Sequence, residues 1–473
     1  MRVALAFAVN ALCNFIIGLL VAKFLGPEGF GRFALALAVG VVIQIACFDW
    51  IRLAAARFAA TRSGQIGTHT RATLDASFVT VTLAVTVLGL GALLGGFDLS
   101  LSPELLGLAL LAAVVNGFFD YQQALVRARF EDGLYARLLL TKNLLSAVLT
   151  VGGAWLTGSA IVAVAGICAA MAGSLASAHR ALRRRGSDHD PASHGRALDF
   201  LRYAKPVVAA NLLYLALALL NRSLVAERHG FAEAGQFSLA FDMGQRITQS
   251  LGMMLDVLLF QLAVRADERH GGEVARAQVA RNMGLAFALL TPACLGLWLV
   301  LPSLEQIAVP TQFRGHFERY FTLLLPGFLC FGLGAYAVAP LFQIARRTGP
   351  LILAALAACA GDLALLALLP PTADSIAMAQ TGAMGCGLLA LILFALATPA
   401  RWPGARDLLS PLLGLGLMAA ALAPMREWTP GVATLTLQIL AGAAIYGATL
   451  IAFDACGLRS SALAFWRSRS KAP

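Results

Sequence analysis

A stripe of polar side chains is the first feature of the sequence that could support chemistry. Spacings of four, three and four residues place four polar residues on one face of a helix: Asn116, Asp120, Gln123 and Arg127. The residues between them are mostly apolar. Because a polar face is costly to expose to lipid, we expect this one to line a cavity or to contact a neighbouring helix. An arginine, a carboxylate and two amides in one stripe can bind an anion, sugar hydroxyls or a proton.

A second polar stripe lies between residues 235 and 263 and contains Asp242, Arg246 and Gln249. Asp242 and Arg246 are four residues apart, so on a helix they can neutralise each other. Two interpretations remain open. Either the pair fixes helix packing, or Arg246 binds an anionic group of a substrate and releases Asp242 to bind H⁺ or Na⁺.

Four further ionisable residues lie within or at the edge of apolar segments: Asp49, Arg52, Arg222 and Asp362. An arginine near a segment end, such as Arg222, can also extend its charged group to water. From all these sets, the candidate substrate-binding residues are Arg246, Asp242, Asp120, Asn116, Gln123, Arg127, Gln249, Arg52 and Arg222. The candidate cation-coupling residues are the carboxylates Asp242, Asp120, Asp49 and Asp362.

The composition indicates that these stripes lie in a membrane. Of 473 residues, 59% are hydrophobic and only 13% are charged, whereas soluble domains carry about a quarter charged residues. This composition argues against soluble enzymes as a class. The eight cysteines form no CxxC pair, the histidines are dispersed, and no GxxxxGK[ST] loop occurs. We therefore predict no metal site, no cofactor and no catalytic residue.

Fourteen apolar segments are long enough to cross a bilayer. They span approximately residues 3–22, 33–51, 76–96, 104–125, 138–157, 159–179, 206–225, 235–263, 282–301, 318–344, 350–370, 375–397, 408–424 and 431–453. With the N-terminus inside, the inner segments and adjoining helix ends carry 28 of the 36 Lys and Arg residues, the outer connections and adjoining helix ends carry 7, and Arg246 lies within a span. This bias follows the positive-inside rule and predicts that both termini are cytoplasmic. The net charge of +11 is then mainly a topology signal, and we expect no nucleic-acid partner.

An internal repeat relates the two halves of the chain. Residues 19–40 align without gaps to residues 223–244, with nine identities in 22 positions. Several identities are glycines in the predicted turn between two helices, where a positive φ favours glycine. Because six predicted helices separate the copies, the two halves have the same orientation in the membrane. The sequence thus predicts an all-α polytopic membrane protein with two six-helix bundles and two C-terminal helices.

The repeat and the charge pattern also suggest domain boundaries. The basic stretch that begins at Arg183 separates the two predicted bundles. The expected parts are an N-terminal bundle, a cytoplasmic basic linker, a C-terminal bundle, and two last helices with a cytoplasmic tail, at residues 1–182, 183–199, 200–398 and 399–473.

Three segments add a resemblance to this pattern: Gly26–Phe33 after the first apolar segment, the basic loop near residue 183, and Leu198–Pro206. They resemble the bacterial polysaccharide-export flippases, which are O-antigen and exopolysaccharide translocases of the multidrug/oligosaccharidyl-lipid/polysaccharide exporter superfamily. Through its helix count and repeat, the resemblance covers most of the chain. It implies an inner-membrane transporter that moves an undecaprenyl-pyrophosphate-linked oligosaccharide from the cytoplasmic to the periplasmic leaflet by alternating access.

The resemblance further implies several partners. These are the lipid-linked oligosaccharide, membrane lipids, H⁺ or Na⁺ as coupling ion, and a polysaccharide polymerase with a chain-length regulator. One departure concerns the end of the seventh helix, where such proteins often carry Asp-Arg and this chain has Asn221-Arg222. At this position the chain therefore has an amide in place of the carboxylate.

Two other functions remain open at this point. One is a multidrug or cation exporter of the same superfamily, and the other is a membrane glycan polymerase or ligase. The mixture of arginine, carboxylates and amides in the polar stripes favours an anionic, sugar-bearing substrate over an organic cation. The longest predicted outer connection, residues 302–317, is short for a loop that would have to assemble a catalytic site.

Overall fold

The computed structural model of the protein describes residues 2–58, 68–95, 101–183, 194–255, 259, 262–263, 272–345, 347–457 and 459–460. Throughout these residues the chain forms helices and short turns, without a β-strand. Helices satisfy their backbone hydrogen bonds internally, which the interior of a bilayer requires of a spanning segment. The predicted all-α membrane fold is confirmed.

Twelve helices within the described residues are long and apolar enough to cross a membrane. α5 continues α4 through the π-helical turn η1 (Ala147–Val151), and α11 continues α10 through the π-helical turn η4 (Gly334–Val338). The α-helices are α1 (Arg2–Phe58), α2 (Thr68–Leu94), α3 (Pro103–Ala128), α4 (Asp132–Ser146), α5 (Gly152–Thr157), α6 (Ala160–Arg183), α7 (His194–Leu255), α9 (Gly272–Ala308), α10 (His316–Leu333), α11 (Ala339–Ile344), α12 (Gly349–Leu368), α13 (Ala373–Leu396), α14 (Ala405–Leu422) and α15 (Val432–Ala452).

Two of these helices, α1 and α7, each contain two of the predicted spans. Their apolar parts are 50 and 49 residues long, more than twice the ~20 residues that one crossing needs. Inside each helix one glycine leaves the helical conformation, Gly26 in α1 and Gly230 in α7. The predicted turns at 23–32 and 226–234 are therefore wrong as loops, because a kink at a single glycine joins the two helical segments directly. Within the described residues the twelve helices nevertheless hold the fourteen predicted spans, and parts of the spans 76–96 and 235–263 lie outside those residues.

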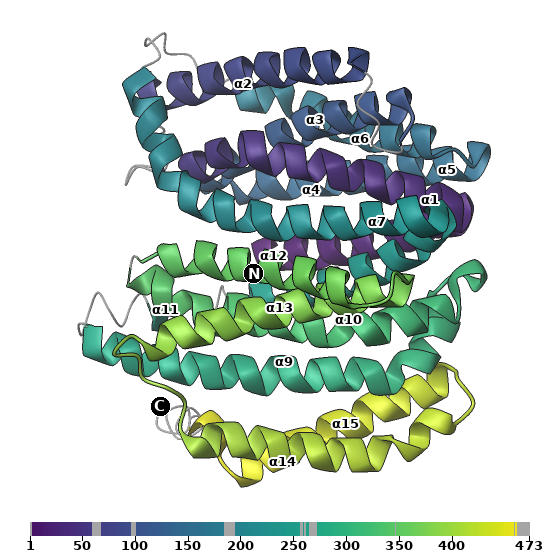
Figure 1. Ribbon diagram of the computed structural model, residues 1–473. Coiled ribbons are helices and arrows are strands. Elements are labelled where there is room, and N and C mark those ends of the chain that lie inside the picture. The colour runs from purple at the N-terminus through teal and green to yellow at the C-terminus, as the bar shows by residue number, and fades with distance from the viewer. Residues whose placement is uncertain are drawn as a thin grey trace, which may run out of the picture. The chain divides into compact units, whose positions relative to one another are not determined.

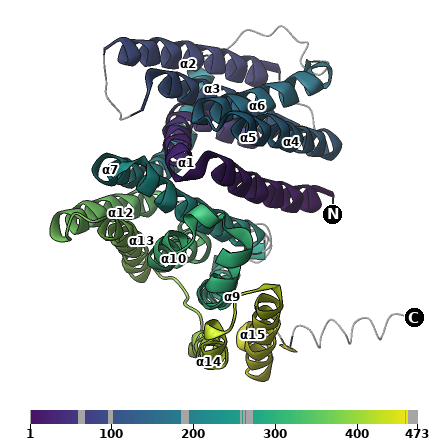
Figure 2. The same ribbon diagram turned by 90° about the vertical axis from the view of Figure 1, so that its right-hand side faces the viewer.

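The first of two compact units comprises Met1–Leu239 and Pro371–Ile376. Within it, α1 packs against α2, α3 and α4, and α6 packs against α3 and α4, as Figures 1 and 2 show. The centre of the packing is apolar, and its largest side chains are at most 1% exposed: Phe48, Ile51, Leu74, Tyr121 and Leu125. The first unit thus has a core of its own that can hold polar groups in fixed positions.

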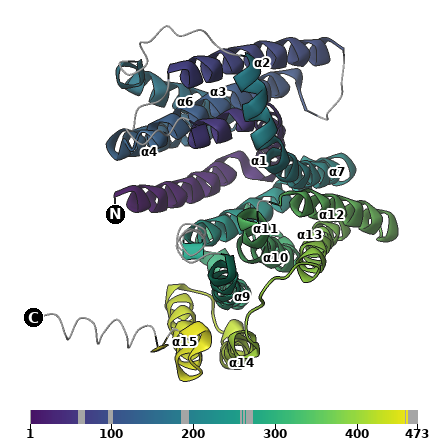
Figure 3. The ribbon, with the colours of Figure 1, turned by 90° about the vertical axis from the view of Figure 1, so that its left-hand side faces the viewer.

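The second compact unit comprises Ala240–Pro370 and Ala377–Pro473. α14 and α15 pack against each other and against α9 (Figure 3). The Tyr446 hydroxyl donates a hydrogen bond to the Ala288 carbonyl at 2.7 Å, and Arg281 Nε donates one to the Cys456 carbonyl at 3.1 Å. The two C-terminal helices are therefore fastened to α9. The domain boundaries predicted at residues 182, 199 and 398 stay a prediction, and residues 184–193 of the basic linker lie outside the described residues.

The repeat is visible in the backbone. Gly26 has φ 67° and ψ 177°, and Gly230, at the equivalent position 204 residues later, has φ 87° and ψ 166°. Five apolar identities of the alignment are buried in both copies: Val21 and Val225, Ala22 and Ala226, Phe33 and Phe237, Leu35 and Leu239, Ala36 and Ala240. Equivalent kinks and equivalent buried faces confirm the predicted parallel repeat.

Candidate functional site

The candidate site lies where α1 and α3 approach each other closely in the first unit. A Cβ atom at Gly40 would lie 2.9 Å from the Ala109 carbonyl oxygen, and one at Gly117 would lie 2.9 Å from Phe48 Cβ. Small residues let helix backbones come this near. Gln44 lies one turn after Gly40 and one turn before Phe48 on α1, so the close crossing brings its amide against α3.

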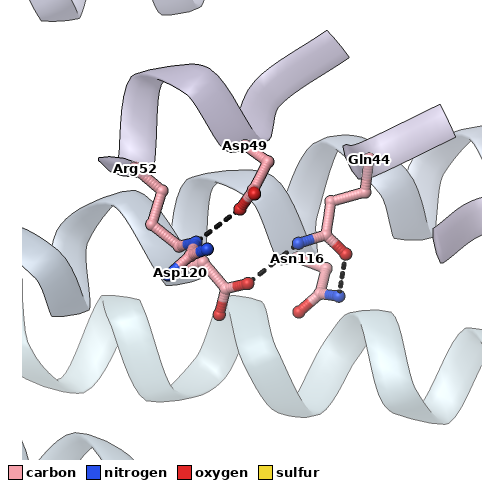
Figure 4. Close-up of polar contacts among 5 residues, drawn as sticks. All are labelled: Gln44, Asp49, Arg52, Asn116 and Asp120. Carbon is pink, nitrogen blue, oxygen red and sulfur yellow. Dashed lines mark hydrogen bonds and ion pairs between the residues drawn. The ribbon is translucent and has the colours of Figure 1, made fainter. Parts of the chain in front are cut away.

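Gln44 bridges two members of the predicted stripe (Figure 4). Its Nε2 donates a hydrogen bond of 2.8 Å to Asp120 Oδ2, and its Oε1 accepts one of 2.5 Å from Asn116 Nδ2. The stripe therefore contacts a neighbouring helix at these two positions. Of the two expectations for this face, the second, a contact with a neighbouring helix, describes Asn116 and Asp120.

Asp49 and Arg52 extend the network along α1 (Figure 4). Arg52 Nε donates to Asp49 Oδ1 at 2.5 Å, and Arg52 also interacts electrostatically with Asp120. The Asp49 side chain is 1% exposed, whereas that of Arg52 is 38% exposed. Asp49 Oδ2 is buried and has no hydrogen-bond partner. The network thus combines two carboxylates with one guanidinium, and Lys142 on α4 also interacts electrostatically with Asp120.

Helix geometry places this network at membrane depth. Asp120 follows the first residue of α3, Pro103, by 17 positions, a rise of about 26 Å at ~1.5 Å per residue. A bilayer core is about 30 Å thick. Since α3 is predicted to begin on the outer side, Asp120 falls in the half of the core that is predicted to face the cytoplasm.

The remaining stripe residues have other surroundings. The Arg127 guanidinium lies over the Tyr135 ring at 5.5 Å from its centroid and is exposed, and Gln123 is half-buried. On α4, Lys142 Nζ donates to Asn10 Oδ1 at 3.4 Å and to Asn14 Oδ1 at 3.5 Å, both on α1. Polar groups from three helices, α1, α3 and α4, thus lie within the first unit.

A second polar contact in this unit was not among the predicted candidates. The Tyr121 hydroxyl donates to Asp75 Oδ1 at 2.6 Å, and Arg71 Nε lies 3.5 Å from Asp75 Oδ2. Tyr121 is completely buried. The i, i+4 spacing of Arg71 and Asp75 was available as a signal, but nothing in the sequence indicates that Tyr121 is their partner.

Other predicted residues lie outside this network. Arg222, expected to reach water from a helix end, is only 7% exposed, so that expectation is wrong: packing within the fold encloses its guanidinium. Asp362 on α12 is 1% exposed. On the second-unit part of α7, Asp242, Arg246 and Gln249 are half-buried. Their roles in binding or coupling stay predictions.

In the part of the chain that the structure describes, no group of three or more His, Cys, Asp or Glu side chains is placed to hold a metal ion. The Gln44 network instead offers carboxylate and amide oxygens beside an arginine, a combination suited to exchanging H⁺ or a monovalent cation.

Comparisons with known proteins bear on this geometry. The family model described as "Polysaccharide biosynthesis protein" matches residues 3–260. The structure titled "Lipid II flippase MurJ, inward closed conformation" is similar with a TM-score of 0.73 and 14% identity, covering 96% of this chain and 98% of that chain. An inward-facing "multidrug resistance MATE family transporter of the MOP superfamily" gives a TM-score of 0.57 and 14% identity, covering 88% and 96%. No curated protein sequence matches the chain. At these identities the structural likeness establishes a shared fold.

Proposed function

Because the chain belongs to the polysaccharide biosynthesis protein family, we propose that it is a flippase for an undecaprenyl-pyrophosphate-linked oligosaccharide. The cargo would be an O-antigen or exopolysaccharide repeat unit, moved from the cytoplasmic to the periplasmic leaflet of the inner membrane by alternating access, with both termini in the cytoplasm. The fold shared with a protein named as a lipid II flippase supports movement of a lipid-linked sugar. A polymerase and a chain-length regulator would then act on the product.

One observation carries this proposal most directly: the network of Gln44, Asp49, Arg52, Asn116 and Asp120 at membrane depth. A charged network inside a membrane span is energetically costly, so such residues are normally either fully paired with one another or involved in binding a substrate or ion. Here one side of Arg52 is held by a buried carboxylate while more than a third of its side chain stays exposed. Such a guanidinium can bind a pyrophosphate oxygen without first losing its existing partner.

The same network supports coupling to a cation. Asp49 presents a buried oxygen without a hydrogen-bond partner, and Asp120 lies within reach of the same arginine. H⁺ or Na⁺ would bind at this oxygen of Asp49, whereas Asp120 also interacts electrostatically with Lys142. When substrate phosphate engages Arg52, the demand for that cation rises, which links the two binding events. In the second unit, Asp242 and Asp362 are the proposed alternatives for this role, and Arg246 is the proposed second anion-binding residue.

A second candidate function is the export of organic cations. It is favoured by the likeness to a multidrug transporter structure. An organic cation would be bound by carboxylates alone, and Arg52 and Arg127 would repel it. The arginines beside the carboxylates therefore favour the anionic sugar lipid.

The test is a leaflet assay in proteoliposomes. Purified protein is reconstituted with a fluorescent undecaprenyl-pyrophosphate oligosaccharide, and a glycosidase outside the vesicles reports how much sugar reaches the outer leaflet. We expect protein-dependent loss of protection, with no change in an undecaprenyl lipid that lacks the pyrophosphate. Equal movement of both lipids, or uptake of a fluorescent organic cation instead, would contradict the proposal. Released free sugar in the absence of glycosidase would point to an enzyme.

A further inference from the structure

The two segments that follow the kink glycines, residues 27–31 and 231–235, contact each other. A Cβ atom at Gly31 would lie 2.0 Å from the Phe231 carbonyl oxygen, and one at Gly235 would lie 1.9 Å from the Pro27 carbonyl oxygen. Gly31 and Gly235 are equivalent in the repeat, and so are Pro27 and Phe231. The contact is therefore reciprocal: each glycine covers the residue that follows the kink in the other copy. All four residues belong to the first compact unit.

The contact between residues 27–31 and 231–235, called the crossing below, is formed by backbone atoms. Gly235 N would lie 2.9 Å from a Cβ at Gly31, and Gly31 N would lie 3.0 Å from one at Gly235. No side chain fits at distances near 2 Å, so each glycine is required by close approach. Beside them, Phe30 and Ala234, another equivalent pair, are 2% and 1% exposed. The contact surface at the crossing, called the seam below, is thus tightly packed and closed to solvent.

The seam also borders open space. A cavity of about 680 Å³ is lined by residues that include Glu28, Arg32 and Phe231. The Arg32 guanidinium lies 5.2 Å from the centroid of the Phe231 ring and 2.7 Å from Glu28. Both members of the Glu28–Arg32 pair are at least half exposed. The buried seam therefore lies next to a solvent-exposed edge of the cavity.

We infer that Gly31 and Gly235 are positioning residues of an outer gate, which this backbone crossing closes. The inference rests on the proposed transport function. Gly31 and Gly235 each lie between two spans, at the end predicted to be extracytoplasmic. Each follows a kink glycine with positive φ, Gly26 or Gly230, about which a helical segment can rotate. Packed contacts have discrete arrangements. The crossing is shut here and separates when the substrate leaves outward.

Labelling tests the closing role. In a variant without native cysteines, Ala234→Cys reports on the seam, and an impermeant maleimide is applied to spheroplasts. We expect weak labelling, which rises several-fold when Gly31→Ala or Gly235→Ala is added, because an added methyl keeps the crossing apart. Gly107→Ala on α3 is the matched control, since nothing lies within 4 Å of a Cβ there. Unchanged protection in the Gly31→Ala protein at normal membrane levels, or labelling from inverted vesicles alone, would overturn the inference.

Cross-linking covers the case in which those variants fail to insert. Arg32→Cys and Phe231→Cys are joined by a short, reductant-sensitive bis-methanethiosulfonate linker. We expect the linked protein to lose glycan translocation and to regain the unlinked level after reduction. Full activity in the linked state would show that the crossing does not open during transport, and would overturn the inference. Labelling needs no substrate, so a responsive gate in a protein that moves no sugar lipid would refute the proposed cargo alone.

Discussion

Arg52 differs from the arginines that anchor helix ends. It is 2.5 Å from a buried carboxylate oxygen of Asp49 and interacts with Asp120, yet its own side chain is 38% exposed. A fully exposed arginine would gain little from a carboxylate partner, and a fully buried one could not reach a substrate. This intermediate exposure is the reason for proposing that Arg52 binds an anionic group of the substrate.

Replacing Arg52 tests this role directly. We expect Arg52→Ala to reduce translocation by about ten- to 100-fold, since a hydrogen bond to a charged group contributes about 1.5–3 kcal/mol. Arg52→Lys should keep part of the activity because it keeps the charge but loses the planar fork. Rates are measured in proteoliposomes, with Arg57→Ala, an exposed arginine on the same helix, as control. Wild-type rates for Arg52→Ala would end its assignment to substrate binding.

Asp49→Asn addresses coupling. The Asn side chain has nearly the same shape as Asp but carries no negative charge, so it cannot take up H⁺ or pair with Na⁺ as a carboxylate does. Transport should therefore no longer respond to an imposed pH or Na⁺ gradient. We expect the rate with a gradient to fall to the rate without one. Asp132→Asn, an exposed residue at the start of α4, should leave the response intact. A gradient response that survives in Asp49→Asn would shift the coupling role to Asp242 or Asp362.

Arg246 provides an independent test in the second unit. If it binds substrate pyrophosphate, Arg246→Ala should abolish translocation while the protein still inserts, and Arg246→Lys should keep part of the rate. If it serves packing with Asp242, Arg246→Ala should lower the amount of folded protein, because a stranded buried charge costs about 3–5 kcal/mol. The double variant with Asp242→Ala would then restore the amount of folded protein. Measuring the protein level and the translocation rate together distinguishes the substrate-binding role of Arg246 from the packing role.

At the scale of elements, α1 and α7 depend on one backbone conformation each. Gly26 and Gly230 combine a φ of 67–87° with a ψ of 166–177°, a region that is essentially open only to glycine. Long apolar helices without such a break would cross the membrane once and continue beyond it. The kink glycines therefore decide how two spans fit in each helix.

Substituting these glycines should destabilise the fold. We expect Gly26→Ala and Gly230→Ala each to cost about 1–3 kcal/mol, seen as a lower unfolding temperature of the purified protein in detergent. Gly133→Ala in α4 meets no atom within 4 Å and should instead raise stability slightly, since alanine is favoured in helices by up to about 1 kcal/mol. Unfolding of Gly26→Ala at the parent temperature would show that the kink is not needed for stability.

At the scale of the whole molecule, the charge bias and the helix count act together. From the even number of spans we predict that both termini lie on one side, and from the excess of Lys and Arg in alternate connections we predict that this side is the cytoplasm. The twelve helices found in the described residues, two of them doubled, preserve this parity. Orientation is the property on which every proposal about inward and outward leaflets depends.

Cysteine labelling checks the orientation. In a cysteine-free variant, we expect an impermeant reagent added to spheroplasts to miss a cysteine placed at Ser187 and to reach one placed at Asp98. The opposite pattern would invert the topology. If Cys456 is retained as a native marker of the tail, burial raises the pKa of its thiol to about 11, so little thiolate is present at neutral pH and its labelling should be slow in either orientation.

The sequence by itself determined the class of fold, the approximate positions of the spans and the repeat. These depend on local properties: a run of about 20 apolar residues needs no partner to be recognised, and the nine identities between residues 19–40 and 223–244 are visible without coordinates. It also identified Asn116, Asp120, Asp49 and Arg52 as costly groups in apolar surroundings.

The tertiary structure decided which of these groups meet. Gln44 joins Asp120 and Asn116 across 76 and 72 positions of sequence, and the burial of Arg222, the Tyr121–Asp75 hydrogen bond and the reciprocal glycine crossing have no local signal. The physical reason is that burial of apolar area is set by each segment's own composition, whereas a hydrogen bond depends on distance and angle between faces of separate helices. Which faces of two helices meet is determined only when the helices pack. Gly40 and Gly117, for example, allow the close approach of α1 and α3 that brings these faces together.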